Sequence, residues 1–441
     1  MSSLFASLNS AAGALRVFQG AIGVTQNNTT NASTPGYAKQ RAVLTADQFE
    51  PSAGLTGGVS DAGVQDGRSR YAEQQVWRQQ ESLGAAGARV SAYSSLESEF
   101  DISGSTGIAA SLTALYQSFS AWSTTPSSLS ARQSVISKAQ DVASSFQQTA
   151  QAIGKAAGDV DQEISGAVQQ VNDLTSQIRD LNAQIQQSSE PDAGLNAQMY
   201  SHLEDLSKLV DFTPLYQPDG TVTVLAGGQV PLVMGDSRQE LKSTDTTTMS
   251  LLTGGKLGGW LSVRDGTLAD LPAALNSLAK GLADRVNNVL TSAGQTSPLF
   301  SYDASNPAGT LAVTSGLTAS DLLTSDTSSS STTSNGATLK LASMADGQDS
   351  ADQIDGMSFL DFYSSLAARV GRESSSAQND QDQGNKQVAQ AQNLRTQVSG
   401  VSLDEEATHL LEWQKSYQAN SEVVSVISSL TTDLMNMFTA G

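Results

Sequence analysis

Apolar residues near the start of the chain recur at spacings that alternate between four and three. They are Leu4, Leu8, Ala11, Leu15, Phe18 and Ile22. A period of about 3.5 residues is typical of a coiled-coil seam, an apolar stripe that needs a partner helix to cover it. This helix is predicted to end by Thr34-Pro35-Gly36, because Pro35 disfavours helical conformation at the residue before it and Gly36 favours a turn.

A matching pattern occupies the last forty residues or so of the chain. Its apolar positions fall on one heptad frame: Leu403, Ala407, Leu410, Tyr417, Val424, Ile427, Leu434 and Phe438. Polar Gln414, Ser421 and Thr431 interrupt the frame. Ser402 is a predicted N-cap, and Asp404-Glu405-Glu406 after it place negative charge where a helix dipole favours it. Each of the two amphipathic helices lacks a local partner, so they are predicted to pair with each other.

The segment between them begins with a predicted helical block. Its best-formed pattern runs from Ile153 to Ile185 and ends at Glu190-Pro191. The other predicted helices are 71–100 and 112–146, with breaks near Ser103-Gly104 and Thr125-Pro126.

The pattern changes after Pro214. Thr221–Val224 and Gln229–Met234 are short β-like runs, and turn residues at 218–220 and 227–228 flank the first of them. This arrangement predicts a small hairpin.

The remaining elements complete the predicted fold class. Helices are predicted over 268–290 and 359–370, with a Gln-rich polar segment after the second, and the Ser/Thr run at 325–334 predicts a loop or disordered tip. The fold is therefore expected to be mainly α with a small β section. The predicted domains are a terminal coiled-coil domain of 1–45 with 400–441, an elongated helical domain of 46–210 with 257–295 and 351–399, and a small β-rich outer section of 211–256 with 296–350.

Charge and composition exclude several classes of function. The chain has 441 residues and a net charge of −20, from 44 acidic and 24 basic residues, so it is a poor match for nucleic acid or an anionic membrane surface. It has no cysteine, which excludes disulfides and thiolate chemistry. No stretch approaches the roughly 18 apolar residues of a membrane span, and the first residues do not resemble a cleaved signal peptide. The protein is expected either to stay in the cytosol or to be exported without a classical signal peptide.

Candidate catalytic and ligand-binding residues do not form a convincing site. The candidates are His202 and His409, the run Gly254-Gly255-Lys256, the series Asp346, Asp349, Asp352 and Asp355, and the carboxylates Glu97, Glu99 and Asp101. The histidines are far apart in sequence, and the glycine run lacks the spacing and the Ser or Thr of a phosphate-binding loop. The acidic series repeats every three residues, unlike a calcium loop, and nothing near the carboxylates would raise a pKa. We therefore predict no enzyme, no metal and no cofactor.

Three groups of motifs resemble the axial proteins of the bacterial flagellum. The run from Asn27 to Tyr37, NNTTNASTPGY, resembles the signature near the N-terminus of rod, hook and hook-associated proteins, and Val401–Glu406 with Tyr417–Asn420 resembles their C-terminal signature. The middle is similar to the hook-associated protein 1 (FlgK) family at Gly258–Asp265, Ala283–Asn287, Phe359–Leu366 and Leu206–Asp211. Hook and rod proteins are expected to pass quickly from the N-terminal helix into β-rich domains, and this sequence is predicted not to.

The resemblance implies a structural role at the junction between hook and filament. It implies self-association in an axial ring, contacts with the hook protein and the second junction protein, a cytosolic export chaperone bound to the C-terminal helix, and export by the flagellar type III system to an extracellular location. It also implies which residues serve assembly. These are Leu4, Leu8, Leu15, Phe18 and Ile22 on the N-terminal helix, Asn28, Asn31, Thr34, Pro35, Gly36 and Tyr37 in the turn motif, and, for assembly and chaperone binding, Leu403, Leu410, Tyr417, Ala419, Asn420, Val424, Ile427 and Leu434 on the C-terminal helix.

Alternatives remain at this stage. The chain could be another axial flagellar protein, such as the hook subunit or the second junction protein, or a secreted binding module. Periodicity alone favours the interpretation that the C-terminal apolar residues form the core of a compact bundle, and the flanking motifs favour assembly instead. The Thr34–Tyr37 turn could be a simple helix stop or a rigid elbow that sets the angle of the terminal helix. If it is an elbow, Gly36→Val is expected to impair assembly more than folding. The terminal helices are expected to be poorly ordered in the free monomer and to order on docking.

Overall fold

The computed structural model describes residues 2–50, 55–97, 100, 106–188, 192–325 and 334–439. Over these residues the protein is mainly helical, with small antiparallel sheets, which confirms the predicted fold class. The chain divides into two compact units, unit 1 (Met1–Glu81, Val171–Glu240 and Asn385–Gly441) and unit 2 (Ser82–Gln170 and Leu241–Gly384). The three-domain boundaries drawn from the sequence stay a prediction. The break predicted near Ser103-Gly104, the helix end predicted at Glu190-Pro191 and most of the predicted loop at 325–334 lie outside the described residues.

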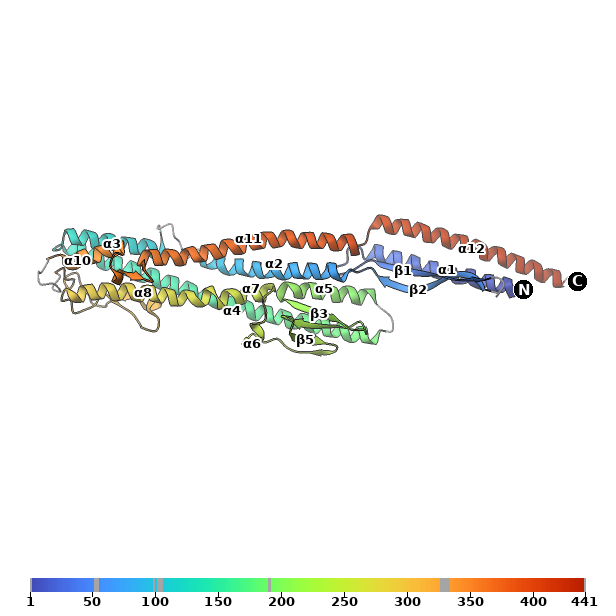
Figure 1. Cartoon of the computed structure of the whole chain (residues 1–441), viewed down its shortest axis with the longest axis horizontal. Coiled ribbons are helices and arrows are strands. Elements are labelled where there is room, and N and C mark those ends of the chain that lie inside the picture. The colour runs from blue at the N-terminus through green and yellow to red at the C-terminus, as the bar shows by residue number, and fades with distance from the viewer. Residues whose placement is uncertain are drawn as a thin grey trace. The chain divides into compact units, whose positions relative to one another are not determined.

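In unit 1, the two terminal helices lie side by side. Helix α1 spans Ser2–Thr30 and helix α12 spans Leu403–Thr439, and each packs along the other (Figure 1). The prediction that the terminal helices pair with each other is confirmed. The turn after α1 is also where the sequence places it, with Gly36 in the left-handed region at φ +71°.

A long antiparallel hairpin follows the turn. Strand β1 (Gln40–Glu50) pairs with β2 (Leu55–Asp66), in a register that runs from Gln40 opposite Asp66 to Glu50 opposite Leu55, and both strands contact α1. A hairpin therefore follows the first helix, where helical structure was predicted from residue 46 on and no early passage into a β-rich domain was expected. The strands expose most of their side chains, so they carry little of the hydrophobic alternation that marks a strand in a sequence.

The rest of unit 1 packs helices against a small sheet. The sheet has the order β3-β4-β5-β6, and it contacts the C-terminal part of α4 through Asn182, which is fully buried. The Asn182 Nδ2 group donates to the carbonyl oxygens of Val222 and Gly235, and its Oδ1 accepts from the Val222 amide, each at 2.9 Å. The hairpin predicted at 221–234 is confirmed. The elements are α2 (Arg70–Glu97), α4 (Leu129–Gln187), α5 (Ala193–Leu209), β3 (Phe212–Tyr216), β4 (Val222–Ala226), β5 (Val230–Met234), β6 (Ser237–Arg238) and α11 (Phe359–Ser399).

Unit 2 is built from the other parts of α2, α4 and α11 together with shorter elements. These are α3 (Gly107–Thr124), α6 (Thr246–Met249), α7 (Gly255–Asp265), α8 (Thr267–Ser292), β7 (Phe300–Ser301), α9 (Pro307–Thr310), β8 (Ala312–Val313), α10 (Gly336–Ser343), β9 (Gln353–Ile354) and β10 (Met357–Ser358). The helices predicted at 268–290 and 359–370 are confirmed, and so is the break at Thr125-Pro126, which separates α3 from α4. The Gln-rich segment after residue 370 continues the helix to Ser399.

The core of unit 2 is large and apolar. Its fully buried side chains include Leu112, Phe119 and Trp122 on α3 and Leu278 and Leu282 on α8. The tight approach of α7 to α2 requires a glycine, because a Cβ atom on Gly259 would lie 2.3 Å from the Ala85 carbonyl oxygen. Among the described helices, none is both long and apolar enough to cross a bilayer.

Candidate assembly surface

The buried residues of α1 are small where this helix is packed between α12 and the β1–β2 hairpin. Ala11, Ala14, Val17 and Ala21 are buried on α1, which packs against both α12 and the β1–β2 hairpin. The hairpin approaches closely, since the Ser10 Oγ atom donates to the Gly57 carbonyl oxygen at 2.6 Å. Small side chains allow such an approach. The buried line of α1 is therefore made mostly of alanine.

The seam residues predicted on α1 lie at the edge of this interface. Leu4, Leu8, Leu15, Phe18 and Ile22 are each partly buried, and none is fully buried. The clearest contact from this set is between the rings of Phe18 and Trp413 on α12, with centroids 6.1 Å apart. The prediction located the right helix pair, and its Ala11 is buried. The other buried apolar residues, Ala14, Val17 and Ala21, each lie one position before a predicted seam residue.

Helix α12 presents two apolar stripes. One stripe faces α1, and its partly buried members are Leu410, Trp413, Asn420, Val424, Ile427, Thr431 and Leu434. The other stripe is exposed and again alternates spacings of four and three: Ala419, Val423, Val426, Leu430, then Asp433 and Met437. At about 100° per residue, the two stripes lie roughly a quarter turn apart. A polar face of Ser421, Ser425, Ser428 and Thr432 lies about a quarter turn to the other side of the first stripe, roughly opposite the exposed one. We call the second group, without Asp433, the exposed stripe.

Much of the apolar surface of the exposed stripe stays uncovered in the described part of the chain. Its large members are 47% exposed at Val423, 53% at Val426, 49% at Leu430 and 76% at Met437. Among the residues of α12 whose side chains the structure describes, Glu406 alone is fully buried. Leu403 and Tyr417, predicted in the seam with α1, are 56% and 37% exposed, and Ala419 is exposed too. The exposed stripe provides apolar area for a further helix to cover.

The turn motif anchors α1 to the start of α12 through Asn28. The Asn28 Nδ2 group donates to the Gln40 carbonyl oxygen at 2.8 Å and to the Glu406 Oε2 atom at 3.1 Å. Its Oδ1 atom accepts from the Gln40 amide and from the Tyr37 hydroxyl, both at 2.9 Å. Burial, and then the charges of Glu406 and Asp66, raise the pKa of Tyr37 to about 12, so the hydroxyl remains a hydrogen-bond donor. Both ends of the chain thus meet at one buried amide.

A second contact between the ends is ionic. The Lys39 Nζ atom lies 2.6 Å from the Glu405 Oε2 atom, and the Lys39 amide donates to the Ser399 carbonyl oxygen at 2.9 Å. The hydrogen bond and charge of Lys39 hold the pKa of Glu405 below its usual range. The Ser402 Oγ atom accepts from the Glu405 amide at 3.5 Å, in line with the predicted N-cap.

The other residues of the turn motif act locally. Asn31 donates through Nδ2 to the Asn27 side chain at 2.8 Å, and its Oδ1 atom accepts from the Thr34 hydroxyl at 3.0 Å. Thr34 and Pro35 are exposed. A Cβ atom on Gly36 would lie 2.2 Å from the Ala197 carbonyl oxygen of α5. We therefore expect Gly36→Val to disrupt the packing of the turn on α5, and not assembly alone, which corrects the expectation from the sequence.

A buried ionic network behind the turn was not predicted from the sequence. The Arg68 guanidinium lies 3.9 Å from the Tyr200 ring centroid, and its Nη1 atom donates to the Glu73 Oε1 atom at 2.8 Å. Glu73 also accepts at 3.2 Å from Arg395, which donates to Glu204 at 2.5 Å. The network joins the start of α2 and the end of α11 to α5. Its members are distant in sequence, and no local pattern marks them.

The candidate catalytic residues are dispersed. His202 lies on α5, and His409 lies on α12, where its ring stacks on Trp413 with centroids 6.3 Å apart. Asp349 and Asp352 both pair with Arg285, at 3.0 and 2.6 Å. Glu97 accepts a hydrogen bond from Ser374 at 2.9 Å, and its predicted companions Glu99 and Asp101 lie outside the described residues. Over the described ranges, no three His, Cys, Asp or Glu residues are grouped to hold a metal ion.

Two family models match the chain. The model of the flagellar hook-associated protein FlgK helical domain matches residues 93–297. The model of the C-terminal domain of the flagellar basal body rod FlgEFG proteins matches residues 395–437, which include most of α12. These matches show that the chain is similar to axial flagellar proteins, with one segment like the FlgK helical domain and a C-terminal helix like that of the rod proteins.

Two curated relatives are both described as flagellar hook-associated protein 1. The Escherichia coli K12 protein is 29% identical over 96 residues, which are 22% of this chain and 18% of the relative. The Bacillus subtilis 168 protein is 30% identical over 102 residues, 23% of this chain and 20% of the relative. The chain thus aligns with about a fifth of the length of these relatives. The chain is thus similar to flagellar hook-associated protein 1 (FlgK) over residues 93–297, and to these relatives over about a hundred residues.

One solved structure is also similar. It is the flagellar hook junction protein FlgK from Burkholderia pseudomallei, at 26% sequence identity and a TM-score of 0.47. The match covers 52% of this chain and 46% of that chain.

Proposed function

We propose that this protein is a structural subunit of the junction between the flagellar hook and filament, and that α1 and α12 assemble with the terminal helices of neighbouring subunits. The matches to two flagellar family models support a flagellar role. The observation that carries the proposal is the exposed stripe of α12, which has coiled-coil spacing while α1 already covers the stripe about a quarter turn away on the same helix.

The energetics favour assembly on this stripe. Full burial of a Val, Leu or Met side chain contributes roughly 1.5–3 kcal/mol, and about half of that remains available for a residue that is half exposed. Val423, Val426 and Leu430 are in this state, and Met437 is more exposed. Together they can contribute several kcal/mol to an interface, which suits an ordered ring of identical subunits.

The remaining partners follow from the family. The neighbours along the axis would be the hook protein on one side and the second junction protein on the other. An export chaperone in the cytosol would cover the C-terminal helix before assembly, and the flagellar type III system would carry the chain outside the cell. In this role the protein is a building block rather than an enzyme.

A charge on the exposed stripe tests the assembly role. Val426→Lys should leave the circular dichroism and melting temperature of the purified chain unchanged, because Val426 is half exposed, and it should abolish filament growth in cells that carry no other copy. Ser425→Lys, on the polar face of the same helix, is the matched control and should support normal filaments. Full-length filaments with Val426→Lys would rule out the stripe as an assembly surface.

Location distinguishes the junction from other axial positions. The rod-type match of the C-terminal helix is shared with rod and hook proteins, so the alternative is another axial part. Immunogold labelling of intact flagella should give a single band at the distal end of the hook. Label along the whole hook, or along the rod, would assign the protein to that part instead.

A further inference from the structure

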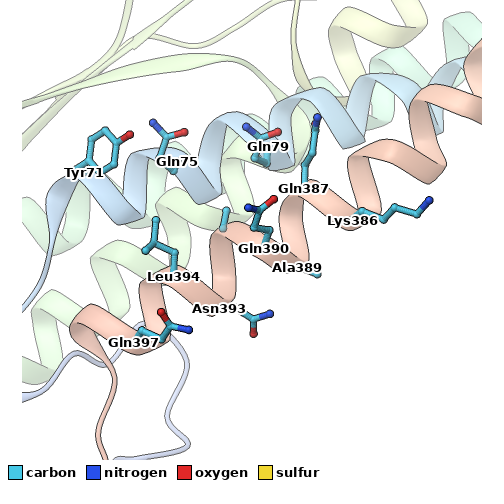
Figure 2. Close-up of a pocket in the computed structure, with 11 residues that line it drawn as sticks. Tyr71, Gln75, Gln79, Lys386, Gln387, Ala389, Gln390, Asn393, Leu394 and Gln397 are labelled. Atoms are coloured by element: carbon cyan, nitrogen blue, oxygen red, sulfur yellow. The ribbon is translucent and has the colours of Figure 1, made fainter.

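A groove of about 880 Å³ lies between α2 and α11 in unit 1. Figure 2 shows amide side chains along it, with Gln75 and Gln79 on α2 and Gln390 on α11. Amides form hydrogen bonds but are not readily oxidised, so this lining differs in kind from the thioethers of methionine. In a chain without cysteine, the thioethers are the side chains that a peroxide attacks most readily, and this chain has eight methionines.

The methionines that the structure describes differ widely in exposure. Met437 and Met435 on α12 are 76% and 59% exposed, and Met234 on β5 is 53% exposed. Met357 is partly buried. Three others are at most 2% exposed: Met199, Met249 and Met344. A peroxide in solution reaches surface thioethers, so oxidation of the folded chain is expected at the first three positions and not at the last three.

The three exposed thioethers lie on different surfaces. Met437 belongs to the exposed stripe of α12, seven residues after Leu430. Met435 follows Ser428 by seven residues, which places it on the polar face of the same helix. Met234 is on β5, outside the terminal helices. Of these three residues, Met437 is therefore the one on the assembly surface.

We propose that Met437 is an oxidation site at which a hydroperoxide, acting on the free chain, blocks assembly. The site is the thioether sulfur, and the co-reactant is hydrogen peroxide or an organic hydroperoxide. The inference rests on the proposed function, because it assigns a control step to the same exposed stripe.

The reaction is a two-electron oxygen transfer. A lone pair of the Met437 sulfur attacks one oxygen of hydrogen peroxide, a sulfur–oxygen bond forms and the oxygen–oxygen bond breaks. The departing hydroxide takes up the remaining proton and leaves as water. The thioether is oxidised to a sulfoxide while the peroxide is reduced, and a methionine sulfoxide reductase reverses the change.

The sulfoxide changes the stripe where it has to be apolar. A thioether is flexible and apolar, which suits a side chain that packs against another helix. A sulfoxide carries a strong hydrogen-bond acceptor, and burial of that oxygen without a donor is unfavourable. In the assembled junction a neighbouring subunit covers the stripe, so the reaction is open to the free chain and closed to the assembled one.

Peroxide treatment of the purified full-length chain tests the site. Peptide mass spectrometry should show one added oxygen at Met437, Met435 and Met234, and none at the three buried methionines. Treated and untreated chains are then added to isolated hooks from cells that lack this chain, and the bound chain is measured by immunoblot. We expect treatment to lower binding at least tenfold, and incubation with a methionine sulfoxide reductase to restore it.

Two leucine variants assign the effect to one sulfur atom. Met437→Leu keeps an apolar side chain that peroxide does not oxidise, and the high exposure of Met437 makes the change compatible with folding. Its binding should be the same before and after treatment. Met435→Leu is the matched control, and treatment should lower its binding as much as that of the unchanged chain. Equal losses for the two variants would place the effect at another residue and overturn the inference.

The remaining outcomes separate this inference from the proposed function. If the untreated chain binds hooks and the chain with a confirmed Met437 sulfoxide binds equally well, the oxidation step is wrong and the junction role stands. The same holds if Met437 resists peroxide in the free chain. If the untreated chain does not bind hooks at all, both proposals fall.

Discussion

Helices α8 and α12 show two ways in which an amphipathic sequence can be used. Helix α8 buries eleven of its residues, among them Leu278, Leu282 and Val286, inside unit 2. Helix α12 is longer, yet Glu406 is the one residue fully buried among those whose side chains the structure describes. The same heptad-like spacing thus gives a fully buried apolar face in α8 and a partly exposed one in α12. Periodicity predicts a helix with an apolar face. An apolar face that the chain itself leaves uncovered, as on α12, indicates a surface for assembly.

The largest expected effect is on the core helix. Leu282→Ala removes a fully buried side chain and should lower the free energy of unfolding by about 2–5 kcal/mol. Val426→Ala on the exposed stripe should change it by less than about 0.5 kcal/mol. Chemical denaturation followed by circular dichroism measures both. Similar losses for the two variants would mean that the stripe of α12 is covered within the free chain, and the contrast between the helices would disappear.

The two parts of unit 1 should also respond to pH in opposite directions. Burial raises the pKa of Glu81 to about 8, against a carboxyl of about 4.5 in the unfolded chain, while the Phe212 amide donates to it at 3.3 Å. The folded state therefore binds an extra proton between these values, and stability falls as pH rises from about 4.5 to 8. Glu81→Gln should abolish this dependence and raise stability at pH 9 by about 2–4 kcal/mol. Denaturation midpoints from pH 5 to 9 measure it.

The matching group at the base of the terminal helices is Glu405, whose pKa is lowered by Lys39. Its contribution is present above the unfolded pKa and is lost as pH falls through the folded value. Glu405→Gln should therefore leave the pH dependence above pH 5 unchanged, which makes it the control for Glu81→Gln. If Glu81→Gln and the unchanged protein lost stability equally between pH 5 and 9, the buried carboxyl would not be the cause.

A smaller loss is expected where the two ends of the chain meet. Asn28→Ala leaves the Gln40 amide and carbonyl and the Glu406 carboxylate without their buried partner, at a cost of about 1–3 kcal/mol. Glu405→Gln removes a surface ion pair worth about 0–1 kcal/mol. Hydrogen exchange of the Gln40 amide reports the local opening. A loss from Asn28→Ala no larger than that from Glu405→Gln would show that the buried amide does not hold the ends together.

Much of the helical fold could be predicted from the sequence, because long periodic segments carry their own signal. The pairing of α1 with α12 followed from two apolar faces without local partners. The short hairpin at 221–234 followed from β-branched runs between turn residues, with Gly220 and Gly227 at positive φ where turns need them. The likeness to FlgK was predicted from motifs in the middle of the chain and the likeness to other axial flagellar proteins from the C-terminal signature, and family models match both regions.

The β1–β2 hairpin and the fine structure of the site could not be predicted in the same way. Most side chains of the hairpin are exposed, so its strands are stabilised by their mutual pairing and by α1 rather than by an apolar face of their own. The bond between Asn28 and Glu406 joins residues 378 apart, and the Glu73–Arg395 pair joins residues 322 apart. Such contacts depend on tertiary packing, which local sequence patterns do not report. The burial of alanines rather than leucines on α1 is also a consequence of tertiary packing, because the hairpin approaches this helix closely.

Hydrogen exchange along α12 tests the central claim most directly. In the free full-length chain, the amides of residues 411–437 should exchange at least tenfold faster than those of α8, because little apolar packing holds this part of the helix in place. In intact flagella the same amides should become strongly protected, as the exposed stripe is covered by neighbouring subunits. Equal protection of residues 411–437 in the free chain and in flagella would contradict the claim that α12 completes its packing only on assembly.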